Sequence, residues 1–146
     1  MKNQILKSTA ILGLFIMLAM TSVSAQAPGR VEVKIPFDFT AGKTEFKAGT
    51  YSIKRITNTA LAVRSIDRET TILVDAPLAI ESRDAKAGER VVFNQYGGQY
   101  FLSQVWLTAD SGRQLFPSRT EEKGASDYKL ANKDAKPGRV EIAASR

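Results

Sequence analysis

The stretch that decides the fold spans residues 91–107 and reads VVFNQYGGQYFLSQVWL. Two runs rich in β-branched and aromatic residues flank Gly97 and Gly98, a pair that can adopt the positive φ angles of a two-residue type I′ turn. The stretch therefore predicts a β-hairpin. Its expected cross-strand pairs are Tyr96 with Gln99, Phe93 with Leu102, and Val91 with Gln104.

One face of this hairpin is apolar, and the other is mixed. Because side chains alternate along a strand, the apolar face would carry Val91, Phe93, Tyr100, Leu102 and Trp106. Such a face needs a second sheet over it. We expect Trp106 to lie between the two sheets, in a core filled by Phe37, Phe39 and Phe93, because a domain without disulfides needs its largest side chains inside.

The rest of the chain reads as short strands, arriving about every 8 to 12 residues with turn residues between them. Residues 31–40 alternate between apolar and polar side chains, which predicts a strand with one buried face. Pro36 cannot donate a ladder hydrogen bond and so places this strand at an edge or a bulge. Further strands are expected at 44–46, 50–56, 60–66, 70–75, 78–82 and 113–116, with 78–82 at an edge.

These patterns predict an all-β fold, an antiparallel β-sandwich or a flattened barrel of about seven to nine strands, with a short, partly helical C-terminal segment. Residues 118–138 are expected to be mobile or to form short helices, with Gly124 ending the first of them. The sequence PGRVEV at 28–33 returns as PGRVEI at 137–142. The two copies are either neighbouring strands of one sheet or a coincidence of composition.

Residues 1–25 have the composition of a secretory signal peptide. A positive start precedes an apolar run at 10–20, and small residues at 23–25 suit a signal peptidase. The run is shorter than the roughly 20 residues of a membrane-spanning helix, so a retained anchor is the weaker alternative. We predict cleavage after Ala25, which leaves a single domain at 26–146 with no membrane span, in the periplasm or outside the cell.

The charge and composition of the chain limit the classes of molecule that it is expected to bind. Loss of two lysines with the signal peptide would lower the formal net charge from +6 to +4. Both signs are interspersed, which favours plain solubility or weak attraction to an anionic envelope polymer. The alternative partner is another protein of the cell envelope. No basic run is long enough to indicate nucleic-acid binding.

The chain contains neither histidine nor cysteine. This excludes a Ser-His-Asp triad, a Cys-His dyad, Cys/His zinc sites and disulfides. The carboxylates fall at predicted turns or outward strand positions, whereas a glycosidase needs two of them facing each other across a cleft. Calcium-binding and phosphate-binding loops are also missing from the sequence. We therefore expect no catalytic residues, no metal site and no cofactor.

With catalytic, metal and cofactor sites not expected, binding of a ligand at the protein surface is the remaining possibility. Tyr96, beside the predicted turn, is the aromatic side chain of the hairpin most suited to exposure. Arg113 and Arg119 flank a short strand and could bind an anion or a polysaccharide carboxylate. Salt bridges to Asp110 or Glu121 would explain these arginines equally well.

Five segments occur in a characteristic order: IPFDF at 35–39, FKAGTY at 46–51, YFLSQVW at 100–106, GRQL at 112–115 and SR at 118–119. In these segments the chain resembles a group of small secreted bacterial β-rich proteins of unknown function. The group usually has proline where this chain has Lys47. The resemblance implies an exported β domain, and it carries no functional residue with it.

The sequence thus favours an exported, non-enzymatic β domain of the cell envelope with a binding or scaffolding role. A lipocalin-like barrel that carries a small apolar ligand is the main alternative. A hydrolase using carboxylates is the third. A filled core would argue against the carrier, and outward-facing carboxylates would argue against the hydrolase.

Overall fold

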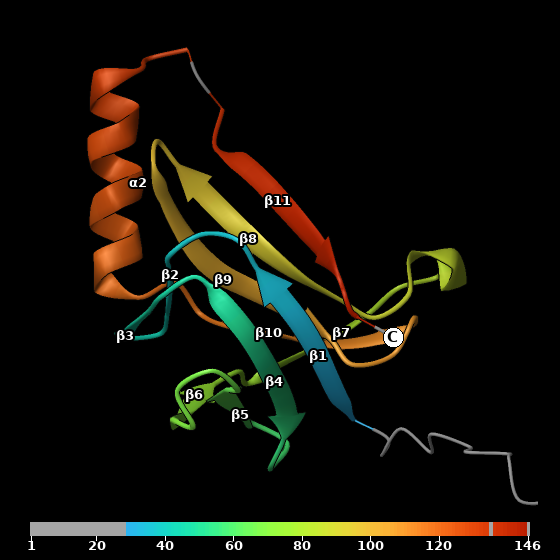
Figure 1. Cartoon of the computed structure of the whole chain (residues 1–146). Helices are drawn as coiled ribbons and strands as arrows, with labels where there is room; N and C mark the ends of the chain where they lie inside the picture. Colours follow the sequence, from blue (N-terminus) through green and yellow to red (C-terminus); the bar gives the residue numbers. More distant parts are fainter. Residues whose placement is uncertain (1–28, 135, 146) are drawn as a thin grey trace, which may run out of the picture.

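The computed structural model describes residues 29–134 and 136–145, and the predicted signal peptide at 1–25 lies outside them. Two β-sheets make up most of the described chain (Figure 1). Sheet A has four antiparallel strands in the order β1–β4–β5–β6. Their bounds are β1 (Arg30–Ile35), β4 (Gly49–Arg55), β5 (Ala60–Ser65) and β6 (Thr71–Asp75).

Sheet B is larger and has seven strands, five of which lie in the order β11–β8–β9–β10–β7. The hairpin of β2 and β3 joins it through β2, which runs parallel to the beginning of β9. The bounds are β2 (Phe39–Ala41), β3 (Thr44–Phe46), β7 (Leu78–Glu81), β8 (Arg90–Tyr96), β9 (Gln99–Trp106), β10 (Ser111–Gln114) and β11 (Gly138–Ala143). A short 3₁₀ helix, η2 (Ala85–Ala87), and the helix α2 (Arg119–Ala131) complete the described elements.

The two sheets pack face to face in a sandwich-like arrangement and do not close into a barrel. The predicted all-β class is therefore confirmed, and of the two predicted architectures the sandwich is the one that forms. The described residues contain eleven strands rather than seven to nine. The break that begins at Pro36 divides the segment predicted at 31–40 into β1 and β2, and β11 is a further strand at the C-terminal end.

The predicted alternation of the first strand is confirmed. Val31, Val33 and Ile35 of β1 have no exposed surface, and the residues between them are exposed. The strand ends at Ile35, immediately before Pro36, and pairs only with β4. Pro36 thus ends an edge strand, as its missing N–H requires.

The central hairpin forms, with a different turn and a shifted register. Tyr96 pairs with Gln99 and Phe93 with Leu102, as predicted, but Val91 pairs with Val105 instead of Gln104. A β-bulge in β9 at Ser103 adds one residue to that strand and causes the shift. Of the two turn glycines only Gly97 has a positive φ, +62°, so the turn is not type I′.

The bulge moves Trp106 to the other side of the sheet. Val105 and Leu107 on either side of it belong to the core between the sheets, so the indole points away from that core. The prediction that Trp106 lies between the sheets is therefore wrong. Its side chain is nevertheless buried, at 6% exposure, on the outer face of sheet B.

The space between the sheets is filled by aliphatic residues and a cluster of aromatic rings. Phe39 is at the centre of this cluster, with ring centres 5.0 Å from Phe46, 5.2 Å from Tyr51 and 5.3 Å from Phe93. Phe37 packs edge-on against Phe93 at 5.1 Å. Of the predicted core rings, Phe39 and Phe93 are buried and Phe37 is half-buried. Edge-to-face contacts of this kind add to the free energy of burial.

The C-terminal segment forms one helix, α2, instead of two short ones. Ser118 caps it by accepting a hydrogen bond from the backbone N–H of Glu121 at 3.2 Å, as the capping-box spacing predicts. The helix continues through Gly124, where an added Cβ would lie 2.8 Å from Gln99 Oε1. The glycine therefore permits close packing on β9 instead of ending the helix. No helix among the described residues has the length and hydropathy to cross a membrane.

The two copies of the PGRVE motif do not share a sheet, so their reading as neighbours in one sheet is wrong. β1 lies at the edge of sheet A, and β11 lies at the edge of sheet B, paired with β8. The chain after β11 still reaches across to β1, because the Ser145 N–H donates to the Glu32 carbonyl at 2.7 Å. This bond joins the two sheets along one side of the sandwich.

Candidate functional site

Tyr96 lies beneath the helix rather than on the surface. Its ring packs against Phe101 and against Tyr128 of α2, with centre distances of 5.9 and 6.3 Å. Burial, followed by the neighbouring Glu121 carboxylate, raises the pKa of the Tyr96 hydroxyl. Tyr96 therefore holds α2 (left in Figure 1) against the tip of the β8–β9 hairpin. The residue is half-buried instead of exposed as predicted.

Glu121 is a buried carboxylate in the same contact. It is 5% exposed and accepts a hydrogen bond from Asn94 Nδ2 at 2.8 Å. The pKa of Glu121 is raised, chiefly because the carboxylate is buried. The hydrogen bonds from Asn94 and Tyr96 lower this pKa, but they do not outweigh the effect of burial. Both partners are on the outer face of sheet B, so the carboxylate attaches the first turn of α2 to the hairpin.

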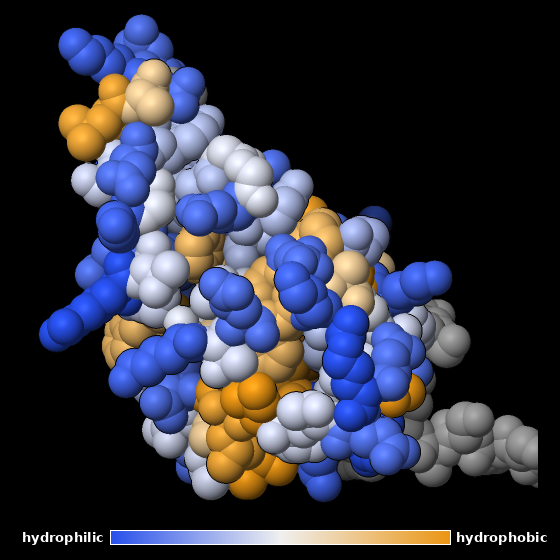
Figure 2. Space-filling view, turned by 60° about the vertical axis from the view of Figure 1, so that its left-hand side comes forward, coloured by the Kyte–Doolittle hydropathy of each residue, from blue (hydrophilic) through white to orange (hydrophobic). Residues whose placement is uncertain are grey.

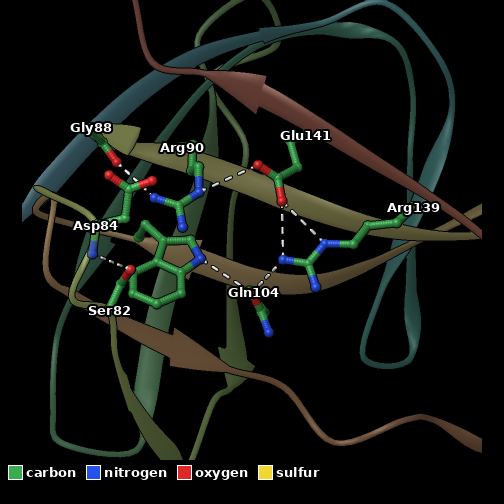
Figure 3. A network of polar contacts seen from close by, with 8 residues as sticks. Ser82, Asp84, Gly88, Arg90, Gln104, Arg139 and Glu141 are labelled. Atoms are coloured by element: carbon green, nitrogen blue, oxygen red, sulfur yellow. Dashed lines mark hydrogen bonds and ion pairs between the residues drawn. The ribbon is translucent and has the colours of Figure 1, made fainter. Parts of the chain in front are cut away.

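Trp106 is covered by Arg90 on the outer face of sheet B (Figure 3). The two residues are cross-strand partners, and the Arg90 guanidinium carbon lies 4.3 Å from the centre of the indole. On the other side Trp106 pairs with Gly112, where an added Cβ would come within 2.9 Å of the ring. The glycine therefore gives the indole room to lie flat. This is a cation–π stack within the sheet, and it leaves the ring closed to ligands.

Polar side chains from three strands complete this region, which we call the Trp106 network. Arg90 Nη1 donates to the Gly88 carbonyl at 3.0 Å, and its Nε lies 3.5 Å from Glu141 Oε2, an ion-pair contact without hydrogen-bond geometry. The indole N–H donates to Gln104 Oε1 at 3.1 Å, and Arg139 of β11 donates to the same oxygen at 3.3 Å. The network attaches the C-terminal strand to the sheet.

An open cleft lies elsewhere, between the β2–β3 hairpin and the turn of the β8–β9 hairpin. Its volume is about 180 Å³. The floor is aromatic, with Phe39, Phe46, Tyr100 and Phe101, and Tyr100 is held in place by stacking on Phe37 at 3.9 Å. The rim is polar and consists of Asp38, Thr40, Glu45, Lys47, Gln99 and Thr120, with Gly98 completing the lining. Figure 2 turns the left-hand side of Figure 1 forward and shows hydrophobic areas among hydrophilic side chains, the strongest of them at the bottom of the view.

The rim is electrostatically organised by one ion pair. Lys47 Nζ donates to Asp38 Oδ2 at 2.7 Å, and the Ala48 N–H donates to Oδ1 at 2.8 Å. These two hydrogen bonds, the one from Lys47 first, hold the pKa of Asp38 below its ordinary value. The same carboxylate raises the pKa of Lys47. Both groups are therefore charged at neutral pH and fixed at the edge of the cleft.

The structure does not bring the three predicted recognition residues together. Tyr96 is half-buried beneath α2, Arg113 is half-buried in β10, and Arg119 is exposed at the first position of α2. Among the described residues, neither arginine forms an ion pair with Asp110 or Glu121, and no hydrogen bond joins any two of the three. The cleft contains none of them.

The sequence did carry signals for some residues of the cleft and its surroundings. Lys47 stands at the start of the predicted turn at 47–49, and it forms the ion pair of the rim. Ser65 follows Leu61 and Val63 at an inward position of β5, which is an unusual place for a hydroxyl. Burial of Glu121 had no local signal, because its position at the third residue of the helix fits a simple capping role.

Within the part of the chain that the structure describes, no group of three or more Asp and Glu side chains is arranged to hold a metal ion. Comparison with family models, curated proteins and solved structures found no match. The resemblance to small secreted bacterial proteins therefore stays a prediction.

Proposed function

We propose that this protein is an exported, non-catalytic domain of the cell envelope that binds a polysaccharide through the cleft beside β3. The observation that carries the proposal is the combination of an aromatic floor with a polar rim. A sugar ring has apolar C–H faces and hydroxyls around its edge, so it suits such a surface. The export part of the proposal rests on the composition of residues 1–25.

The rim offers both kinds of hydrogen-bonding partner. Asp38 and Glu45 accept, Lys47 donates, and Gln99 and Thr120 can do either. Ligand pockets for drug-sized molecules occupy about 300–1,000 Å³. The cleft, at about 180 Å³, is smaller and open to solvent. This size favours one unit of a polymer lying over the surface rather than an enclosed small molecule.

The chemistry of the carboxylates disfavours the hydrolase. A general acid needs a carboxyl whose pKa lies near the operating pH. The pKa of Asp38, in the rim, is lowered instead, chiefly by the hydrogen bond from Lys47. Glu121 has a raised pKa but is occupied with Asn94 beneath the helix, and it does not line the cleft.

The shape of the domain disfavours the carrier of a small apolar ligand. A lipocalin-like carrier needs a closed barrel with an interior large enough for its ligand. Here the two sheets remain separate, and the aromatic cluster around Phe39 occupies the space between them.

A calorimetric titration of the exported chain with short neutral oligosaccharides tests binding. The variant Thr120→Trp places an indole at the mouth of the cleft, and we expect affinity to fall by about tenfold or more, equivalent to 1.4 kcal/mol or more. Lys129→Trp is the matched control, because residues nine positions apart lie on opposite sides of a helix. Equal loss in both variants, or no binding by the wild type, would contradict the proposal.

Fractionation of a bacterium expressing the full chain tests export. The proposal predicts a processed protein outside the inner membrane, with Gln26 as its first residue. An unprocessed chain in the cytoplasm would contradict this part of the proposal and leave the binding measurement valid.

A further inference from the structure

A second hollow of about 140 Å³ lies on the other side of β3. It shares Glu45, Phe46 and Lys47 with the cleft, so β3 separates two neighbouring depressions. Its walls are mainly apolar and include the rings of Phe46 and Tyr51 with Ile72 of β6. Three polar residues, Ser65, Arg68 and Thr70, complete the side formed by sheet A.

The Ser65 hydroxyl in this hollow is buried and has no hydrogen-bond partner. The residue is 5% exposed, and Tyr51 is its cross-strand neighbour. The Tyr51 hydroxyl donates to the Lys47 carbonyl, and its oxygen keeps lone pairs that can still accept a hydrogen bond. Ser65 lies near the Tyr51 oxygen without reaching normal hydrogen-bond geometry. Buried hydroxyls in proteins are almost always paired, so an unpaired one that lines a hollow indicates a missing partner.

Arg68 supplies a positive charge beside this hydroxyl. It lies in the turn between β5 and β6, close enough to Tyr51 to oppose the rise in the Tyr51 pKa that burial causes. Among the described residues, no carboxylate oxygen lies within 4 Å of the Arg68 guanidinium. Lys47 is neutralised by Asp38, and Glu45 is the one carboxylate in the lining. Arg68 is therefore the cation of the lining that has no ion-pair partner among the described residues.

We propose that this hollow binds a carboxylate group of the polysaccharide, so that the ligand is built from acidic sugars of the uronate type. The proposal rests on the function proposed above. Arg68 can hold a carboxylate through two parallel N–H groups, and Ser65 donates its unused hydroxyl proton to the same group. The apolar walls contact the ring carbons. A polysaccharide that lies across β3 places one sugar unit in the cleft and the carboxylate of the next unit in the hollow.

Calorimetric titration of the exported chain with two matched oligosaccharides, one neutral and one with alternate uronate units, tests this assignment. We expect the uronate form to bind about tenfold more tightly, as a charge-assisted hydrogen bond allows. Arg68→Gln should abolish this preference, and Ser65→Ala should reduce it. Arg64→Gln is the matched control, because Arg64 is the neighbouring exposed residue on the opposite face of β5. It should leave the preference unchanged.

The outcomes separate the two proposals. Equal affinity for both oligosaccharides in the wild type would overturn the carboxylate site and leave the proposed function intact, whereas no binding of either would overturn both. A preference that survives Arg68→Gln would also overturn the assignment. A glutamate-rich peptide is included as a third probe, and tighter binding of that peptide than of the uronate would reassign the surface to a protein partner.

Discussion

The Trp106 network and the two depressions beside β3 are both built from aromatic rings and charged side chains of the same domain. Each contains a buried polar atom without a hydrogen bond, but Arg90 Nε in the network faces the Glu141 carboxylate at 3.5 Å, whereas the Ser65 hydroxyl lines a hollow. In the network, Arg90 covers the indole, and the indole N–H has a partner in Gln104. Beside β3, a cleft opens over half-buried Tyr100 and the buried rings of Phe39, Phe46 and Phe101, and the hydroxyl of Ser65 has no partner.

This difference indicates which aromatic cluster supports the fold and which one is available for binding. The Arg90 guanidinium stacks on the indole and Gln104 accepts its N–H, so long polar side chains contribute to the burial of the ring. Natural proteins pair their buried polar groups, and an exception in a hollow points to a ligand. Changes in the network should therefore alter stability, and changes beside β3 should alter binding.

The largest expected effect follows from removing the indole. Trp106→Ala should lower the free energy of unfolding by about 3 kcal/mol, because it leaves a cavity and exposes the Arg90 stack. Urea denaturation measures this change. Phe116→Ala is the control, since its ring is 60% exposed and should cost no more than about 0.5 kcal/mol. A similar small loss for Trp106→Ala would mean that the network does not support the fold.

Overpacking the same region should have a smaller effect. A Cβ at Gly112 would lie 2.9 Å from both the indole and the Val105 carbonyl. Gly112→Ala should therefore cost about 1–3 kcal/mol, measured in the same way. The control is Gly98→Ala, because an added Cβ there meets nothing within 4 Å and the residue has no positive φ. Equal stability of the two variants would show that the indole does not lie flat over Gly112.

The buried carboxylate under α2 predicts a pH dependence. Because burial raises the folded-state pKa of Glu121 above its ordinary value of 4.5, the folded chain keeps that proton when the unfolded chain has released it. Its contribution to stability is therefore present at low pH and is lost as the pH rises from 4.5 through the folded-state pKa. Glu121→Gln should reduce this slope in urea titrations. Glu122→Gln changes an exposed neighbouring residue and should leave this pH dependence of stability unchanged. If neither variant alters the pH dependence, Glu121 is not its source.

The smallest effect on stability should come from the depression itself. Ser65→Ala removes a buried hydroxyl without a partner, so the free energy of unfolding should stay the same or rise by up to about 1 kcal/mol. The measurement is again urea denaturation, now combined with the binding titration. A loss greater than about 1 kcal/mol would show that the hydroxyl is hydrogen-bonded in solution.

Much of the fold could be predicted because alternation and turn residues act locally. The alternation of Val31, Val33 and Ile35 predicted a buried face, and Pro36 predicted an edge. The bulge at Ser103 could not be predicted, because nothing in its local sequence distinguishes a bulge from regular pairing. That one residue reverses the face of Trp106.

The candidate site was largely missed for a similar reason. Tyr96, Arg113 and Arg119 were chosen for their residue types, and long-range packing places them on separate elements. The cleft and hollow bring together residues from β2, β3, β4, β5, β6, β9 and α2, and strand order determines these neighbours. Gly124 shows the same limit, since only its packing on Gln99 explains a glycine inside the helix.

The most direct test of the account is a nitrogen–proton NMR titration of the exported chain with the uronate oligosaccharide. Trp106 is the single tryptophan of the chain, so its indole N–H gives one signal that reports on the network. The account predicts shifts confined to the linings of the cleft and the hollow, at residues 38–47, 51, 65–72, 98–101 and 120, with the indole signal unmoved. A shifted indole signal together with unchanged signals beside β3 would contradict it.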